Sequence, residues 1–339
     1  MEFVKKNLIA FIVILILAVI VISGQKLSEK KLPKSAGKPQ ELTQVKLGKS
    51  PVPVHALAVN VTKKKGIFAK NGLDVEDSAL IGGNANALAS GQVDYQVQIF
   101  ASFLASDVKG SEARWISTVL RADKFYLLSN KEITSIKKVG INRLGGEDYY
   151  ETVMAMKLAG IPLDNIEFVT TGGYEGKLPI LLKGGVDVVG LPLIAGLSSE
   201  NFEKDGLRVL FDLAEGENSY YPVGLLALEK TIKNNPETVQ KISESLAEGV
   251  AYAREETRKN EIISMIISDY SVDQKNAQEI YDGFLAGTDN LDPVPREDFV
   301  RELLKLMEKD IPEAKDYDPL QFIAEDKKAE IYLQEGYGI

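Results

Sequence analysis

An internal repeat constrains this chain of 339 residues more than any other feature. The pattern Leu-x-x-Gly-x-Val-Asp spans 88–94 and again 181–187. Each copy is typical of the end of a helix, a glycine with positive φ and the start of a strand. Apolar segments at Val45–Leu47 and Val139–Ile141 begin 49 and 48 residues before the two aspartates. Each half is therefore predicted to form a similar α/β lobe.

The segments between these landmarks also match in kind and order. In each half a helix-like stretch is followed by a glycine, a second apolar strand and a Gly-Gly pair. The matching positions are Gly72 and Gly160, Leu73–Val75 and Ile166–Val169, and Gly82-Gly83 and Gly172-Gly173. A strand–helix–strand–helix–strand series repeated at nearly equal length predicts two domains of one architecture.

Composition excludes several classes of function. Hydrophobic residues make up 45% of the chain and charged residues 26%, as in ordinary globular proteins. The net charge of −9 favours no nucleic-acid partner. The absence of cysteine excludes disulfides, thiolate metal sites and a cysteine nucleophile, and a single histidine argues against a histidine-rich metal site. We expect no catalytic residues, no metal and no cofactor.

The N-terminus carries a membrane-targeting signal. Lys5 and Lys6 precede an apolar run over 8–22, whose length lies between a signal-peptide core and a full membrane span. Residues 1–25 are predicted to be a cleaved signal peptide or an uncleaved membrane anchor. Residues 26–44, rich in Lys, Pro, Ser and Gly, are predicted to be a solvated linker. With either reading, the folded part lies outside the cytoplasmic membrane, in the periplasm or on the membrane's outer face.

The order and spacing of short motifs resemble one known family. The motifs are Lys65–Phe68, Asn71–Val75, Gly82-Gly83 and 87–94 in the first half, and Lys137–Ile141, Leu158–Ile161 and 182–187 in the second. Together they resemble the extracytoplasmic substrate-binding proteins of nitrate/sulfonate/taurine and thiamine-precursor ABC importers. The resemblance covers about 45–192.

This resemblance implies a type II periplasmic-binding-protein fold, in which two Rossmann-like α/β lobes joined by two crossovers close over a small-molecule ligand. It also implies an ABC permease and its ATPase as partners, and we expect a monomer. Apolar segments at Arg114–Val119 and Phe125–Leu128 are predicted strands, and Tyr220–Leu228 is the predicted return crossover. We assign 45–130 and 223–339 to lobe 1, and 131–222 to lobe 2.

The chain after Pro236 is predicted to be helical. Ser271–Gln274 matches a capping box that would open one helix. Phe299, Leu303, Leu304 and Met307 fall on one face of another, which is typical of a packing face.

The ligand site is predicted from a rule for open α/β sheets, in which ligands bind beyond the carboxyl ends of the strands. In lobe 1 this rule selects Pro53, His55, Gly83, Asn84, Gln98 and Phe100. In lobe 2 it selects Asn142, Arg143, Gly145, Gly146, Tyr149, Thr170, Thr171 and Pro192. Tyrosine side chains near these loops, including Tyr149, could stack on a flat ligand. Tyr221 in the return crossover is therefore included in the predicted site.

Two readings stay open at the most informative of these loops. The helix start near Asp148, with two glycines and Arg143 before it, could bind an anion. Alternatively, Glu147 and Asp148 satisfy the start of their own helix. His55 is likewise either a ligand contact or a cap for the helix that follows it. The repeated aspartates, Asp94 and Asp187, are interpreted as structural.

The sequence therefore predicts a non-enzymatic solute-binding protein of an ABC importer, with a sulfonate- or taurine-like anion or a thiamine-precursor-like heterocycle as ligand. One alternative is a ligand-sensing domain that signals to a partner protein. A weaker alternative is a pyrimidine-synthesis enzyme of the same fold, because such enzymes carry a cysteine-rich motif that this chain lacks.

Overall fold

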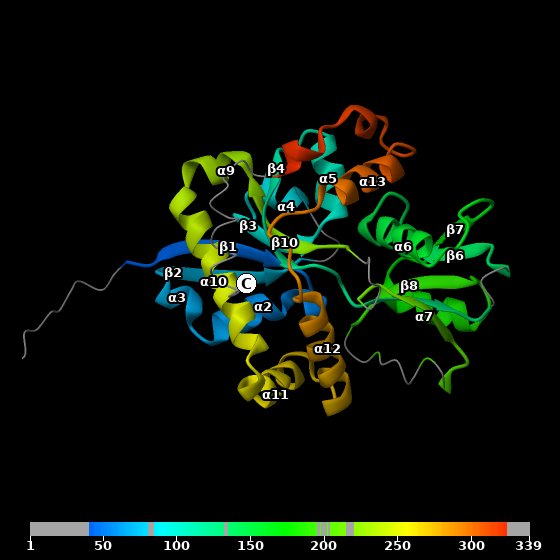
Figure 1. Cartoon of the computed structure of the whole chain (residues 1–339), viewed down its shortest axis with the longest axis horizontal. Coiled ribbons are helices and arrows are strands. Elements are labelled where there is room, and N and C mark those ends of the chain that lie inside the picture. The colour runs from blue at the N-terminus through cyan, green and yellow to red at the C-terminus, as the bar shows by residue number, and fades with distance from the viewer. Residues whose placement is uncertain are drawn as a thin grey trace, which may run out of the picture. The chain divides into compact units, whose positions relative to one another are not determined.

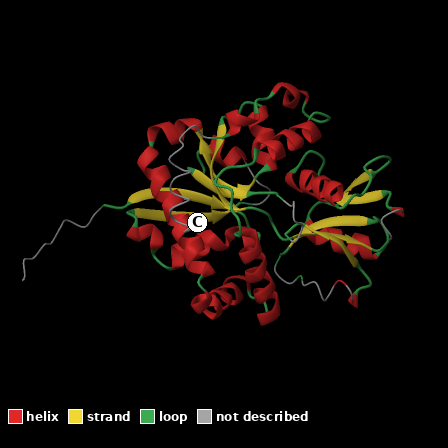
Figure 2. Ribbon diagram, viewed as in Figure 1, coloured by secondary structure: helices red, strands yellow, loops and turns green. Residues whose placement is uncertain are grey.

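The computed structural model describes residues 41–80, 85–131, 135–194, 197, 202, 204–214 and 220–323. Its strands form two five-stranded sheets, each accompanied by helices (Figures 1 and 2). The predicted pair of α/β lobes is confirmed. The contacts that join the lobes lie within one compact unit that begins at Leu42.

The first sheet is built from two separate parts of the chain. Its strands are β1 (Thr43–Lys49), β2 (Leu73–Ala79), β3 (Tyr95–Ile99), β4 (Ala113–Leu120) and β10 (Val223–Leu228). They lie in the order β2-β1-β3-β10-β4. β1 pairs in parallel with β2 and β3, whereas β10 runs antiparallel to β3 and β4. The strand that returns from the second lobe thus lies inside the first sheet.

The second sheet repeats this arrangement. Its strands are β5 (Phe125–Ser129), β6 (Lys138–Ile141), β7 (Glu167–Thr170), β8 (Val188–Pro192) and β9 (Arg208–Asp212). They lie in the order β7-β6-β8-β5-β9, with β6 parallel to β7 and β8, and β5 antiparallel to β8 and β9. β5, which arrives from lobe 1, takes the place that β10 takes in the first sheet. The two lobes exchange equivalent strands.

This pairing changes one predicted boundary. The sequence analysis ended the first part of lobe 1 at residue 130, but Phe125–Ser129 pairs with β8 and β9 of the second sheet. The first crossover is therefore the short segment 121–124. An apolar run predicts a strand, but it does not identify the sheet that will pair with it.

The helices follow the predicted series. In the first lobe they are α2 (Pro53–Lys64), α3 (Ile67–Lys70), α4 (Ala85–Ala89) and α5 (Ala101–Val108); in the second they are α6 (Glu147–Leu158) and α7 (Tyr174–Leu182). After β10 come α9 (Glu229–Asn234), α10 (Pro236–Arg254), η2 (Glu256–Arg258), α11 (Lys259–Tyr270), α12 (Gln274–Gly287), α13 (Glu297–Met307), η3 (Pro312–Asp316) and η4 (Pro319–Phe322). α10 packs against α2 and contacts β4, so the C-terminal helices complete lobe 1.

The repeated motif performs the same structural task in both lobes. Gly91 and Gly184 each have φ of +72°, a conformation that favours glycine. The carboxylate of Asp94 accepts the backbone N–H of Lys46 at 2.9 Å. That of Asp187 accepts the N–H groups of Lys137 and Lys138 at 2.8 and 2.9 Å. Each aspartate thus ties the strand that follows it, β3 or β8, to its parallel neighbour, β1 or β6, which confirms the structural interpretation.

One predicted helix start is wrong. Ser271 does not cap α12; it lies at the C-terminus of α11 with φ of +53°. The cap is Asp273, whose side chain accepts the N–H of Asn276 at 2.8 Å. Both residues belong to the types preferred at helix N-termini, and the end of the preceding helix decides between them.

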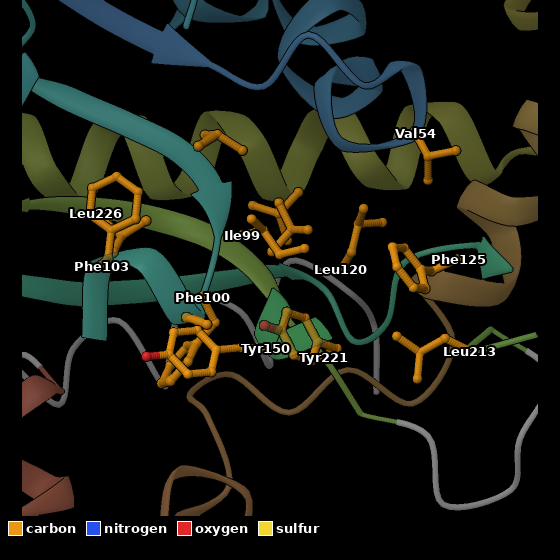
Figure 3. Close-up of a cluster of buried hydrophobic side chains, with 14 of the residues drawn as sticks. Val54, Ile99, Phe100, Phe103, Leu120, Phe125, Tyr150, Leu213, Tyr221 and Leu226 are labelled. Atoms are coloured by element: carbon orange, nitrogen blue, oxygen red, sulfur yellow. The ribbon is translucent and has the colours of Figure 1, made fainter. Parts of the chain in front are cut away.

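Apolar side chains gather where the lobes meet. Figure 3 shows Leu120 at the end of β4, Phe125 at the start of β5, and Tyr150 and Tyr221 in the same buried cluster. All four are buried. The segments that cross between the lobes are thus packed in a hydrophobic core.

The structure describes no helix that is long and apolar enough to span a membrane. Residues 1–25 and the first fifteen residues of the predicted linker lie outside the described part of the chain.

Candidate functional site

Of the predicted residues of lobe 1, Pro53, His55, Gln98 and Phe100 are described, and all four are buried in different environments. Pro53 is the first residue of α2. The Gln98 side chain donates to the carbonyl of Leu80 at 3.2 Å. Phe100 packs on Trp115, with 5.0 Å between ring centroids. Gly83 and Asn84 lie outside the described residues.

His55 points toward the first crossover. Its Nδ1 lies 3.0 Å from Oγ of Ser50, and its Nε2 lies 2.8 Å from Oδ2 of Asp123. The second contact has the distance of an ion pair, but its geometry leaves both atoms without a hydrogen bond. Val52 is the N-cap of α2, and no side chain caps it, so the reading of His55 as a helix cap is wrong. His55 instead connects lobe 1 to the crossover.

In lobe 2, the predicted loop turns tightly into α6. Gly145 has φ of +65°, and Gly146 is the N-cap. A Cβ atom at Gly146 would lie 2.8 Å from Cγ of Arg143, so a side chain there would require the Arg143 side chain to move. The side chain of Arg143 is exposed. The N–H of Asn142 donates to Oδ2 of Asp148 at 2.7 Å. A side chain of the protein itself therefore satisfies this part of the loop.

The other predicted residues of lobe 2 lie around the same sheet edge. Tyr149 packs against Phe168, with 5.0 Å between ring centroids. Thr171 donates its hydroxyl to the carbonyl of Ile141 at 3.0 Å. Thr170 is exposed at the end of β7, and Pro192 is buried at the end of β8. Tyr149 thus makes a packing contact, and Thr171 makes a hydrogen bond to the backbone.

Glu147 makes a connection between the lobes that the sequence did not predict. Its carboxylate accepts the backbone N–H groups of Ala101 and Ser102, at 3.2 and 2.5 Å, in the first turn of α5. The hydroxyl of Tyr221 donates to the same carboxylate at 3.0 Å. Burial raises the pKa of Glu147, although these hydrogen bonds act in the opposite direction. The helix N-terminus that binds a carboxylate is thus that of α5, and the carboxylate is that of Glu147 in α6.

Asp148 forms a buried ion pair with Lys177 of α7. The Lys177 ammonium also donates to the carbonyl of Gly190 at 2.6 Å. Burial lowers the pKa of Lys177, although the charge of Asp148 opposes that effect. The two acids at the start of α6 therefore have partners elsewhere in the protein, and the prediction that they satisfy their own helix is wrong.

Two further acids complete the site. Asp123 in the first crossover is 0% exposed, and Glu151 in the second turn of α6 is 1% exposed. Both oxygens of Asp123 and Oε1 of Glu151 are buried without a hydrogen-bond partner. Burial and the charges of Asp123, Glu147 and Asp148 raise the pKa of Glu151 well above its usual range. We call His55, Asp123, Glu147 and Glu151 the junction cluster.

Within the junction cluster, Oδ1 of Asp123 and Oε1 of Glu151 have neither a hydrogen bond nor an ion pair. Buried polar atoms in folded proteins nearly always have partners, so unpartnered carboxylate oxygens indicate a place for a molecule that supplies hydrogen-bond donors. The described part of the chain contains no group of three or more His, Asp or Glu side chains placed to hold a metal ion. The junction cluster is suited to binding a molecule that supplies hydrogen-bond donors.

Sequence reasoning missed Asp123 and Glu151, although a signal for each was present. Asp123 is an acid in the short link between two predicted strands. Glu147 and Glu151 stand four residues apart, a spacing that places like charges on one helix face at a cost in stability. Because this spacing of like charges destabilises the helix, it indicates that the two glutamates interact with groups outside the helix.

Comparisons with known proteins identify the fold. No curated protein matches the chain significantly. The periplasmic aliphatic sulphonate binding protein SsuA from Escherichia coli has 15% identity and a TM-score of 0.66, over 83% of this chain and 92% of that one. A ligand binding component of an ABC-type import system from Staphylococcus aureus has 13% identity and a TM-score of 0.64, over 87% and 99%. The periplasmic nitrate-binding protein NrtA from Synechocystis PCC 6803 has 12% identity and a TM-score of 0.61, over 87% and 86%.

These similarities confirm the predicted type II periplasmic-binding-protein fold, which the two equivalent sheets and their exchanged strands already indicated. The model of the family described as NMT1/THI5 like matches residues 53–259, which is more than half of the chain. That range contains all four residues of the junction cluster. The chain therefore belongs to the NMT1/THI5-like family.

Proposed function

We propose that this protein is the extracytoplasmic solute-binding component of an ABC importer. It captures a small organic solute between its two lobes and delivers it to a membrane permease driven by an ATPase. The junction cluster supports this function best, because it joins buried residues of α2, the crossover and α6 and leaves carboxylate oxygens without partners. Similarity to solute-binding proteins of importers points in the same direction.

The proposal includes the setting in which the protein works. It acts as a monomer outside the cytoplasmic membrane, either exported by residues 1–25 as a cleaved signal or tethered by them as a retained anchor. It releases its ligand chemically unchanged. The ligand classes implied by the family resemblance are a sulfonate- or taurine-like anion and a thiamine-precursor-like heterocycle.

A thermal-shift screen tests this function. Purified protein is mixed with nitrate, taurine, alkyl and aryl sulfonates, aminopyrimidines, thiamine and amino acids. A ligand at 100 times its Kd stabilises the native state by about 2.7 kcal/mol. For a protein of this size that corresponds to roughly 5–10 °C in Tm, from about 2–4 °C per kcal/mol.

A hit is then examined by small-angle X-ray scattering and by mass spectrometry of the recovered ligand. We expect the radius of gyration to fall on binding and the ligand to be recovered unchanged. Chemical conversion of the ligand, or binding with no change in the radius of gyration, would contradict the proposal.

A further inference from the structure

The carboxylates of Asp123 and Glu151 share one environment although they come from different parts of the chain. Asp123 lies in the crossover after β4, and Glu151 lies in α6 of the second lobe. The charge of Asp123 contributes to the raised pKa of Glu151, so the two groups interact. Three of their four carboxylate oxygens are buried without a hydrogen bond, and one of these, Oδ2 of Asp123, lies 2.8 Å from Nε2 of His55. Both acids lack hydrogen-bond donors at the same place, so they form a single site.

The protein's own donors satisfy the neighbouring acids first. Lys177 pairs with Asp148. The first turn of α5 and Tyr221 donate to Glu147. After these pairings, acceptors of Asp123 and Glu151 still lack a hydrogen bond.

The same arrangement disfavours an anionic ligand. Two like charges at short distance repel more strongly in a partly buried site than in water, because the effective dielectric constant is lower. An anion beside Asp123 and Glu151 would meet this repulsion from each carboxyl that is ionised. The carboxylate of Glu147 already accepts the first backbone N–H groups of α5, which would otherwise be available to bind an anion. Arg143, the predicted counter-charge, is exposed.

We propose that the ligand of this protein is a small organic cation, whose ammonium, guanidinium or amidinium N–H groups donate to the carboxylates of Asp123 and Glu151. This inference rests on the proposed solute-binding function and narrows its substrate class. A charged N–H donor supplies the missing hydrogen bonds and compensates one unit of negative charge in the same contact. His55, whose Nε2 lies 2.8 Å from Asp123, holds that carboxylate in place.

Matched pairs of probes test the inference on the full chain in detergent micelles. Each pair differs in one cationic nitrogen group: benzamidine and benzamide, taurine and ethanesulfonate, phenethylamine and phenethyl alcohol. A neutral aminopyrimidine and nitrate are added as single probes. Calorimetric Kd values are measured for the wild type, Glu151→Gln and Asp123→Asn. Glu167→Gln serves as the control, because the Glu167 side chain is 62% exposed on β7.

We expect the member with the cationic nitrogen group, in at least one pair, to bind at least tenfold more tightly than the member that lacks it. Glu151→Gln and Asp123→Asn should each weaken that binding at least tenfold, whereas Glu167→Gln should change it less than twofold. Tight binding of ethanesulfonate, nitrate or a neutral probe that survives both substitutions would overturn the cation inference and leave the solute-binding function standing. Binding of no probe would overturn both.

Discussion

The carboxylate of Glu147 accepts the backbone N–H of Ser102 at 2.5 Å, so the first turn of α6 in the second lobe binds the first turn of α5 in the first. The oxygens of one acid also accept from Ala101 and Tyr221. Helix N-termini present unsatisfied N–H groups and a positive partial charge, and a carboxylate suits both. This contact joins the lobes directly.

Replacement of Glu147 by alanine should destabilise the folded protein in the form in which the two lobes are in contact. The substitution leaves two backbone N–H groups and the hydroxyl of Tyr221 without their acceptor. Leaving buried donors unsatisfied costs about 1–3 kcal/mol in the free energy of unfolding. Urea denaturation measures that cost, and small-angle scattering should show a larger radius of gyration.

The surface variant Glu167→Ala is the matched control and should change stability by no more than about 0.5 kcal/mol. Tyr221→Phe, which removes one of the three donors to Glu147, should have a smaller effect than Glu147→Ala. Equal stability of Glu147→Ala and the wild type would show that the contact does not join the lobes in solution.

Glu151→Gln should stabilise the ligand-free protein. Burial and the negative charges of Asp123, Glu147 and Asp148 raise the pKa of Glu151, against the attraction of Lys177. A carboxyl whose pKa is raised in the folded state opposes folding once it ionises. The wild type should therefore lose stability as the pH rises above about 4.3, the unfolded value, toward the folded pKa.

The amide of Gln does not ionise, so the advantage of Glu151→Gln should grow with pH across that interval and then stay constant. Urea denaturation at a series of pH values measures it. Stability that falls in Glu151→Gln at neutral pH would mean that the carboxylate has a stabilising partner. A gain in stability combined with weaker ligand binding would identify Glu151 as a binding residue that costs the fold stability.

Asp187 should stabilise lobe 2 with the opposite dependence on pH. Burial raises the pKa of this carboxyl, but the Lys131 ammonium and the N–H groups of Lys137 and Lys138 outweigh burial and lower it overall. A lowered pKa contributes stability that is present above the unfolded value of about 3.9 and is lost as the pH falls through the folded pKa.

Asp187→Asn should therefore cost about 1–3 kcal/mol at pH 7, the range for hydrogen bonds to a charged group, and less at pH 2. Chemical denaturation at the two pH values provides the measurement. Asp94→Asn, the equivalent change in the first lobe, removes a carboxylate that accepts the N–H of Lys46. An equal loss for Asp187→Asn at both pH values would contradict a role for its charge.

The glycine turns of the repeat should be equivalent in energy. Gly91 and Gly184 both have φ of +72°, and a Cβ atom at either position would meet no atom within 4 Å. The cost of alanine is then the backbone conformation alone, about 1–2 kcal/mol for an L-residue in this region. Thermal denaturation of Gly91→Ala and Gly184→Ala should give losses that agree within error. A much larger loss at one site would mean that the two turns are not equivalent.

Much of the architecture followed from local patterns. The repeated Leu-x-x-Gly-x-Val-Asp motif predicted two lobes, because a glycine between a helix and a strand imposes the same turn wherever it occurs. Asp94 and Asp187 were correctly interpreted as structural, since each stands at the start of a strand and away from its carboxyl end. The loop before α6 was located from its two glycines.

The sequence by itself thus determined the repeat, the strands and helices, and the two-lobed class of fold. Only the tertiary structure decided which sheet Phe125–Ser129 joins and which groups meet Glu147, Asp123 and Glu151. The physical reason is the range of the interactions. Hydrophobic periodicity and turn preferences act over a few residues. The partners of a buried charge between the lobes, in contrast, come from segments that are far apart in the sequence and meet only in the folded protein.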